Sequence, residues 1–250
     1  MDRALWISWY DLPERGRDDY LSWLHGSYLP RLLERHGLLW AAHFATEEKP
    51  IRTAKKDGHG RRYPPAASVP GGYHYLLIAG AEHPHAFVDP APRQWHAQLS
   101  AGERGMLALR SGEASNIMVE QARIDGPEAG HREAGVALSP CIQLGSFVFD
   151  GDEGELLAWY ANWRLPSMTT LPGCVGVRKL VSVSGWAKHA ILHEFTSVEA
   201  RNANFVNFEE KHHPDKAAWS AKVTGQVVHY PGSPNVARRI GSAAKHPSKT

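Results

Sequence analysis

An internal repeat limits the folds open to this sequence more than any other pattern in it. A tryptophan, a proline and a glycine recur at the same spacing of seven in two segments: Trp23, Pro30 and Gly37 in the first, and Trp159, Pro166 and Gly173 in the second. A leucine precedes the proline in both segments, and an aromatic residue followed by an aspartate recurs at Tyr10 and at Phe149. These shared anchors predict that the chain contains two copies of one supersecondary unit.

The apolar pattern around the anchors predicts the first elements of each copy. Runs at 5–10 and 142–149 are typical of buried strands, and the segments that follow them carry apolar residues at helical spacing. The proline late in each helix removes a backbone donor and should kink or end the helix. Gly37 and Gly173 then occupy the position at which a helix commonly ends in a left-handed conformation.

The rest of each copy is expected to add three strands and a second helix. The expected strands cover residues 38–44, 73–78 and 116–124 in the first copy, and 175–183, 189–195 and 223–230 in the second. A second helix should follow Ser197, and its counterpart in the first copy should lie between residues 89 and 110. Each copy is therefore β-α-β-β-α-β, which predicts an α+β protein made of two fused ferredoxin-like repeats.

The boundaries of the repeats follow from these elements. We expect the first repeat at residues 1–125, a linker at 126–139, the second repeat at 140–232, and a loose C-terminal tail at 233–250. A stretch at 45–72 falls outside the repeat and is basic and rich in proline and glycine. It is predicted to form a long loop, which either contacts a ligand as a lid or is merely mobile.

Composition narrows the class of protein. The 250 residues are 42% hydrophobic and 22% charged, as in ordinary globular proteins. The chain has 28 Lys and Arg against 26 Asp and Glu, a net charge of +2, and such a balance argues against a nucleic-acid partner. No apolar run approaches the roughly 18 residues that a membrane span needs, and residues 1–16 lack a signal-peptide pattern. We therefore expect a cytoplasmic protein with no membrane partner.

The order of these anchors resembles the dimeric α/β-barrel superfamily. The resemblance rests on a strand, a helix with tryptophan several residues before Leu-Pro, a glycine and a second strand, and it covers about residues 4–124 and 140–232. It implies that the two repeats form within one chain the barrel that single-repeat members form as dimers. The superfamily includes cofactor-free monooxygenases, cyclases, isomerases and haem enzymes, so the resemblance specifies the fold more closely than the activity.

Packing of the two repeats predicts where a ligand would bind. A sheet covered by helices on one face leaves its other face bare, so we expect the two bare faces to meet and enclose a cavity. Strand alternation predicts the substrate-binding residues in this cavity: Trp6, Ser8, Tyr10, His43, Tyr75, Gln143, Phe147 and Phe149. Small apolar residues suit the side beneath a helix, so His189 and His193, which alternate with such residues, are also expected to face the cavity.

Four residues are candidates for catalysis: Tyr28, Arg164, His189 and His193. Many members of the superfamily carry a histidine directly before the Leu-Pro pair, where this chain has Tyr28 and Arg164. Either candidate histidine could act as a general base near neutral pH, with Tyr28 or Arg164 stabilising negative charge on an oxygen. The alternative is structural: histidines that are hydrogen-bonded in an interface, a core tyrosine and a surface arginine.

No metal site is predicted from the sequence. His189 and His193 would lie about 13 Å apart along one strand, too far to share an ion. The histidine pairs at 83 and 85 and at 212 and 213 lack acidic or cysteine partners at ligand spacing.

These observations favour a cofactor-independent enzyme of the isomerase, cyclase, lyase or monooxygenase type. Its substrate would be a hydrophobic or aromatic small molecule that carries a carbonyl group. Two alternatives stay open: a haem-dependent enzyme with a histidine as axial ligand, and a non-enzymatic small-molecule-binding or stress-associated protein. The sequence also leaves open whether two chains associate as a homodimer.

Overall fold

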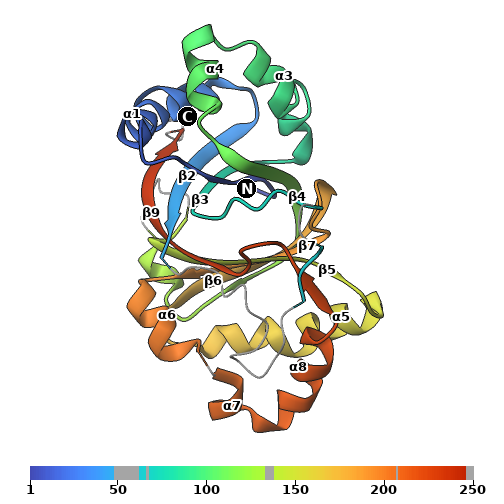
Figure 1. The fold of residues 1–250 in the computed structure, drawn as a ribbon. Helices are drawn as coiled ribbons and strands as arrows, with labels where there is room; N and C mark the ends of the chain where they lie inside the picture. Colours follow the sequence, from blue (N-terminus) through green and yellow to red (C-terminus); the bar gives the residue numbers. More distant parts are fainter. Residues whose placement is uncertain (48–61, 66–67, 133–137, 207, 246–250) are drawn as a thin grey trace.

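Helices cover the two outer faces of the molecule, and the strands lie between them (Figure 1). The computed structural model describes residues 1–47, 62–65, 68–132, 138–206 and 208–245. No helix among these residues is long and apolar enough to span a membrane.

The first half of the chain has the predicted β-α-β-β-α-β order. Its strands are β1 (Ala4–Asp11), β2 (Leu38–Thr46), β3 (Tyr75–Ala81) and β4 (Ser111–Asp125). Its helical segments are α1 (Arg17–Trp23), η1 (Leu24–Tyr28), α2 (Leu29–Glu34), η2 (Pro84–Phe87), α3 (Pro92–Ala97) and α4 (Ala101–Leu107). The second helix, which the sequence placed only between residues 89 and 110, is therefore a pair of short helices.

The second half repeats this order after a short 3-10 turn, η3 (Ala129–His131). Its strands are β5 (Cys141–Phe149), β6 (Cys174–Ser184), β7 (His189–Phe195) and β8 (Val227–His229). Its helical segments are α5 (Glu153–Trp159), η4 (Tyr160–Arg164), η5 (Pro166–Thr170), α6 (Val198–Asn204), α7 (Phe208–His212), η6 (Pro214–Lys216) and α8 (Ala217–Thr224). A last strand, β9 (Asn235–Ala244), follows the repeat.

The strands form a closed antiparallel barrel. Their order is β7-β6-β4-β1-β3-β2-β9-β5, and pairing of β5 with β7 closes the ring, while β8 pairs with the outer end of β5. Two seams join the halves: β4 pairs directly with β6, and β9 lies between β2 and β5. This confirms the α+β class and the two ferredoxin-like repeats.

The C-terminal tail is not loose as predicted, because β9 supplies a strand that the second seam needs. Asn235, Val236 and Ala237 are buried. Ala237 pairs with Thr46 on one side and with Ile142 on the other. Without this segment, the facing edges of β2 and β5 would keep unpaired backbone groups, which is costly at a buried edge.

The predicted loop at 45–72 lies largely outside the described residues. Its described end contacts the second half of the chain. Arg62 forms an ion pair with Asp150 at 2.6 Å, and the hydroxyl of Tyr230 donates to the backbone oxygen of Pro70 at 2.8 Å.

A π-helical turn interrupts the first helix of each repeat at the same place, directly before the Leu-Pro pair. The amide of Leu29 bonds to the oxygen of Leu24, and that of Leu165 bonds to the oxygen of Tyr160, each five residues back. The proline that follows each turn has no N–H to donate, which favours an irregular turn here. Each turn ends at a candidate catalytic residue, Tyr28 or Arg164. The glycines that follow have the predicted left-handed conformation, with φ 78° at Gly37 and φ 81° at Gly173.

Side chains from both halves fill the interior of the barrel. Leu5, Ile7 and Trp9 of β1 meet residues of the second half such as Ile142, Leu144 and Leu192 in one buried cluster. Among the described residues, the two sheets therefore pack against each other where the sequence analysis expected an open cavity. Dense packing of this kind is typical of a protein core.

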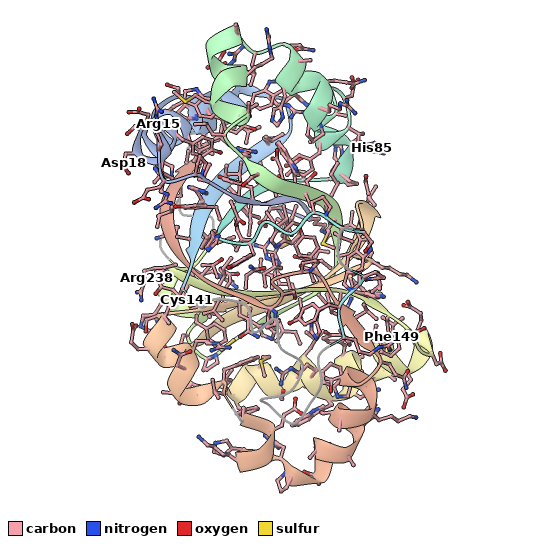
Figure 2. All side chains as sticks on the ribbon, in the orientation of Figure 1. Arg15, Asp18, His85, Cys141, Phe149 and Arg238 are labelled. Atoms are coloured by element: carbon pink, nitrogen blue, oxygen red, sulfur yellow. The ribbon has the colours of Figure 1, made fainter. Side chains whose placement is uncertain are left out.

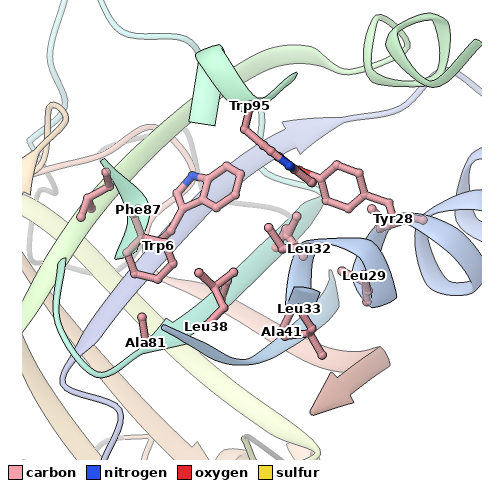
Figure 3. Close-up of a cluster of buried hydrophobic side chains, with 14 of the residues drawn as sticks. Trp6, Tyr28, Leu29, Leu32, Leu33, Leu38, Ala41, Ala81, Phe87 and Trp95 are labelled. Carbon is pink, nitrogen blue, oxygen red and sulfur yellow. The ribbon is translucent and has the colours of Figure 1, made fainter. Parts of the chain in front are cut away.

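The predicted facing of the strand residues is wrong for the same reason. The following residues point toward the helices rather than into the barrel: Trp6, Ser8, Tyr10, His43, Tyr75, Gln143, Phe147, Phe149, His189 and His193. Figure 3 shows Trp6 in a cluster with Tyr28 and Leu32 of the first repeat's helices, and Figure 2 places Phe149 at the side of the second half, near α5. In a barrel covered by helices, the inner and the helix-facing side of each strand are both buried. The size of its residues therefore does not indicate which side of a strand faces the helices.

Candidate functional site

A cavity lies between the sheet of the first half and α3. We call it the β1–α3 cavity; its volume is about 270 Å³, and its polar and aromatic lining comprises Trp6, Ser8, Arg93, His96, Glu113 and Ser115. The strand residues share the helix-facing side because Ser8 pairs with Ser115 across β1 and β4, and Trp6 and Glu113 lie two residues from them. Alternation thus brings two predicted binding residues, Trp6 and Ser8, to a cavity other than the expected one.

Two polar atoms in the lining are buried without a protein partner. The indole Nε1 of Trp6 and the hydroxyl of Ser8 are fully covered, yet neither makes a hydrogen bond with any described residue. Buried polar groups nearly always have partners, so such atoms in a cavity wall indicate a place where a ligand or water binds.

His96 projects from α3 into the cavity, and Tyr28 positions it. The hydroxyl of Tyr28 lies 2.8 Å from Nε2 of His96, which leaves Nδ1 without a described partner. Burial lowers the pKa of His96 to about 4, and the nearby Arg110 and Arg35 add to this effect. Burial also raises the pKa of Tyr28. Both side chains are therefore neutral at pH 7, and the Tyr28 hydroxyl can donate to Nε2 so that Nδ1 carries a proton toward the cavity.

A buried arginine holds the acidic residue of the cavity in place. The Arg110 side chain is completely covered; Nη1 donates to Glu113 at 2.6 Å, and Nε donates to the hydroxyl of Tyr20 at 2.6 Å. Its guanidinium carbon lies 4.4 Å from the centre of the Tyr10 ring. Only Oε1 of Glu113 is used in this contact, so Oε2 remains available beside the cavity.

The other predicted residues of the first half form a hydrogen-bonded chain behind the cavity. The hydroxyl of Tyr10 lies 2.8 Å from Nε2 of His43, and Nδ1 of His43 lies 2.9 Å from Nε2 of His25. Tyr75 stacks on both Tyr10 and His43. Burial holds the pKa of His43 well below its usual value. The structure brings these residues together, but they do not line the β1–α3 cavity.

In the second half, His193 and Arg164 lie around one phenylalanine. The ring centre of His193 is 4.9 Å from that of Phe205, and the guanidinium carbon of Arg164 is 4.8 Å from it. Arg164 also pairs with Glu209 at 2.7 Å. The two nitrogens of His193 make no well-aligned hydrogen bond with described residues, and burial depresses its pKa strongly. Gln143, a predicted binding residue, accepts instead from Arg201 at 2.8 Å.

His189 belongs to a separate polar group. Its Nε2 lies 2.9 Å from Glu153, and its Nδ1 lies 3.0 Å from the ammonium of Lys179. Burial lowers the pKa of Lys179 to about 7. The structure therefore distributes the four predicted catalytic residues over three places: Tyr28 beside the β1–α3 cavity, Arg164 with His193, and His189 with Lys179.

The sequence analysis missed His96, Glu113, Arg93 and Arg110. His96 and Arg93 lie on α3, whose short length and proline-rich start obscured a helical period. Strand alternation could have found Glu113. β4 (Ser111–Asp125) begins five residues before the expected strand, and this earlier start places Glu113 on the same face as Ser115. Arg110 directly precedes that strand.

Solved structures with a similar architecture are known. No protein-family model and no curated protein matches the sequence. A proposed monooxygenase from Fusobacterium nucleatum matches in structure with a TM-score of 0.57 at 10% identity, over 98% of this chain and 95% of that chain. An anthrone oxidase-like protein matches with a TM-score of 0.58 at 10% identity, over 98% and 94% of the two chains. A dye-decolorizing peroxidase from Bacteroides thetaiotaomicron matches with a TM-score of 0.51 at 8% identity, over 96% and 93%.

This chain has the dimeric α/β-barrel fold. Structural matches at such low sequence identity show the fold alone. The activity has to be inferred from the site. Within the described residues of this α/β barrel, no group of three His, Cys, Asp or Glu side chains is placed to hold a metal ion.

Neither His96 nor His193 is placed to act as the axial ligand of a haem group. An axial histidine needs a ring nitrogen that faces a space wide enough for the macrocycle. His96 faces a cavity bounded closely by Trp6 and Glu113, and its Nε2 is bonded to Tyr28. His193 is enclosed by aromatic rings, with Phe195 stacked on one side and Phe205 edge-on to it.

Proposed function

We propose that this α/β-barrel protein is an enzyme that needs no resident cofactor and acts in the β1–α3 cavity. Its substrate is an aromatic small molecule with a carbonyl group, and the common step is removal of an acidic proton. The observation that carries the proposal is the pairing, in one cavity wall, of a carboxylate with a free oxygen and a neutral histidine with a free ring nitrogen.

Each group has one role in this proposal. Oε2 of Glu113 takes the proton from the substrate, and Arg110 keeps the carboxylate oriented through Oε1. As the proton leaves, negative charge develops on the carbonyl oxygen. His96 donates from Nδ1 to that oxygen, and the unpartnered hydroxyl of Ser8 supplies a second donor. Trp6 offers a flat surface for the aromatic part of the substrate.

The fate of the resulting anion defines the reaction class. It can be reprotonated elsewhere, which is an isomerisation, attack a second carbonyl, which is a cyclisation, or react with dioxygen. The anthrone oxidase-like and monooxygenase neighbours favour the last outcome as a working hypothesis. The proton-removal step can be tested without deciding among them.

The test measures deuterium incorporation at the acidic C–H of aryl ketones by NMR in deuterated buffer under nitrogen. The panel is anthrone, 1-tetralone and 2-acetylnaphthalene. We expect the wild-type protein to accelerate exchange of at least one ketone about 100-fold over buffer, a usual effect of general acid–base catalysis. Glu113→Gln should abolish most of this acceleration. Glu155→Gln is the matched control, because Glu155 pairs with Lys222 on the surface of the other half.

Two results would contradict the proposal. Equal rates of deuterium exchange with the wild-type protein and with Glu113→Gln would show that Glu113 is not the base. Binding of the ketones without any acceleration would favour the non-enzymatic alternative, a small-molecule-binding protein.

A further inference from the structure

A second cavity, wide open to the solvent, lies between α3 and α4. We call it the α3–α4 cavity; its volume is about 330 Å³, and its lining comprises Arg93, His96, Ala97, Arg104, Leu107 and Ala108. Arg93 and His96 line both cavities. A ligand bound in either cavity would therefore contact Arg93 and His96.

The α3–α4 cavity is cationic, and no described contact neutralises it. Arg93 makes no hydrogen bond or ion pair with any described residue, and the described hydrogen bond of the Arg104 guanidinium goes to the backbone oxygen of Leu99. The nearest acid in sequence, Glu103, is already held by Arg31 at 2.7 Å and by the backbone of Ser100 at 2.8 Å. Apart from His96, the remaining lining is apolar.

The two cavities thus differ in charge. The β1–α3 cavity contains the carboxylate of Glu113 as well as Arg93, whereas the α3–α4 cavity presents two guanidinium groups and no carboxylate. Guanidinium groups bind carboxylates through paired, charge-assisted hydrogen bonds. The asymmetry favours one orientation for a ligand with an aromatic and an anionic end.

We infer that the α3–α4 cavity binds a carboxylate carried by the substrate, so that the substrate is an aromatic carbonyl compound that also carries a carboxylate. The inference rests on the proposed function for the placement of the aromatic part. Arg93 is the specificity-determining residue, because it lines both cavities, and Arg104 assists it.

Isothermal titration calorimetry with 2-naphthoate and 2-naphthamide tests the inference, because the two ligands have the same ring system and differ in charge. Wild-type protein should bind 2-naphthoate at least tenfold more tightly than 2-naphthamide. Raising the salt concentration should weaken only the binding of 2-naphthoate. Arg93→Gln and Arg104→Gln should each remove most of the tenfold preference, because each weakens the binding of 2-naphthoate more than that of 2-naphthamide.

Arg15→Gln is the matched control, since Arg15 is also an exposed arginine of the first half but lies near α1 (Figure 2). It should retain the full preference. Equal affinity for the two ligands in the wild type, an unchanged preference in both variants, or no binding of either ligand would overturn the inference. The ketone exchange experiment does not involve a carboxylate, so it can succeed while this inference fails, and the reverse also holds.

Discussion

Burial lowers the pKa of five described histidines of this barrel: His25, His43, His96, His189 and His193. In each of them burial is the largest cause of the lowered pKa. In the unfolded chain the same side chains titrate near pH 6.5. Above that pH these histidines are neutral in both the folded and the unfolded chain, so their titration does not change the free energy of unfolding. Below it the unfolded chain binds protons that the folded chain does not, so acid destabilises the fold.

His193 allows this effect to be measured, because its ring nitrogens make no well-aligned hydrogen bond with described residues. Between pH 6.5 and 5.5 its titration should lower the free energy of unfolding by about 1 kcal/mol. His193→Leu removes that contribution, so the variant should lose about 1 kcal/mol less than wild type over this interval. Urea denaturation at pH 7.5, 6.5 and 5.5 gives the comparison. A pH dependence identical in the two proteins would mean that His193 titrates normally in the folded state.

The same residues show what a sequence can reveal about a site. Strand alternation correctly grouped Trp6 with Ser8 on one face, and His189 with His193 on another. It could not say which face meets the helices, because both are buried and the barrel interior takes residues as large as Trp9. The partners that make His96 a candidate, Tyr28 and Arg110, are 68 and 14 residues away in sequence, and no local pattern links them.

At the scale of elements, the repeat predicted nearly all of the strands and the kinked first helices. These depend on local signals: apolar runs, a proline and a terminal glycine. The segment Asn235–Ala244 was missed because it lies outside the repeat and mixes charged and small residues. Its outward side chains are solvated, and its backbone pairing with β2 and β5 is a property of the closed barrel.

Substitution of Ala237 tests whether β9 stabilises the barrel. Ala237→Pro removes a backbone donor from a strand paired on both sides, and we expect it to lower the free energy of unfolding by about 3 kcal/mol or more, or to prevent folding. Ala237→Gly keeps the donor and should cost about 1 kcal/mol. Urea denaturation measures both. If the segment were a loose tail, each variant would lie within about 0.5 kcal/mol of wild type.

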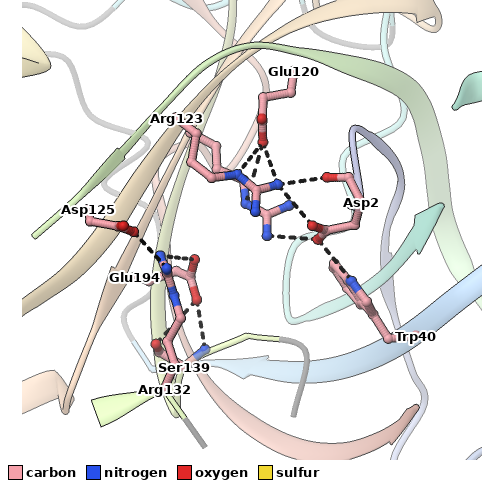
Figure 4. Close-up of polar contacts among 9 residues, drawn as sticks. Asp2, Trp40, Glu120, Arg123, Asp125, Arg132, Ser139 and Glu194 are labelled. Atoms are coloured by element: carbon pink, nitrogen blue, oxygen red, sulfur yellow. Dashed lines mark hydrogen bonds and ion pairs between the residues drawn. The ribbon is translucent and has the colours of Figure 1, made fainter. Parts of the chain in front are cut away.

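At the scale of the whole molecule, a buried ion cluster connects the N-terminus with both halves (Figure 4). Asp2 accepts from Arg123 of β4 at 2.9 Å and from Trp40 of β2 at 2.9 Å, and it pairs with Arg178 of β6 at 2.8 Å. Burial raises the pKa of Asp2, but Arg178 and Arg123 outweigh it, so the pKa is lowered. One carboxylate therefore joins strands from both repeats beside the β4–β6 seam.

The cluster makes Asp2 more important for stability than its place near the chain end suggests. Asp2→Asn keeps the shape of the side chain but leaves Arg178, whose side chain is 5% exposed, with less compensating charge. Breaking a buried pair in this way costs about 3 kcal/mol, so urea denaturation at pH 7.5 should show a loss of that size. Glu82→Gln is the control, because it neutralises an exposed carboxylate of the first half and should change the free energy of unfolding by less than about 0.5 kcal/mol. Equal effects of the two substitutions would mean that the halves are held together by strand pairing and the apolar interior, with no contribution from this cluster.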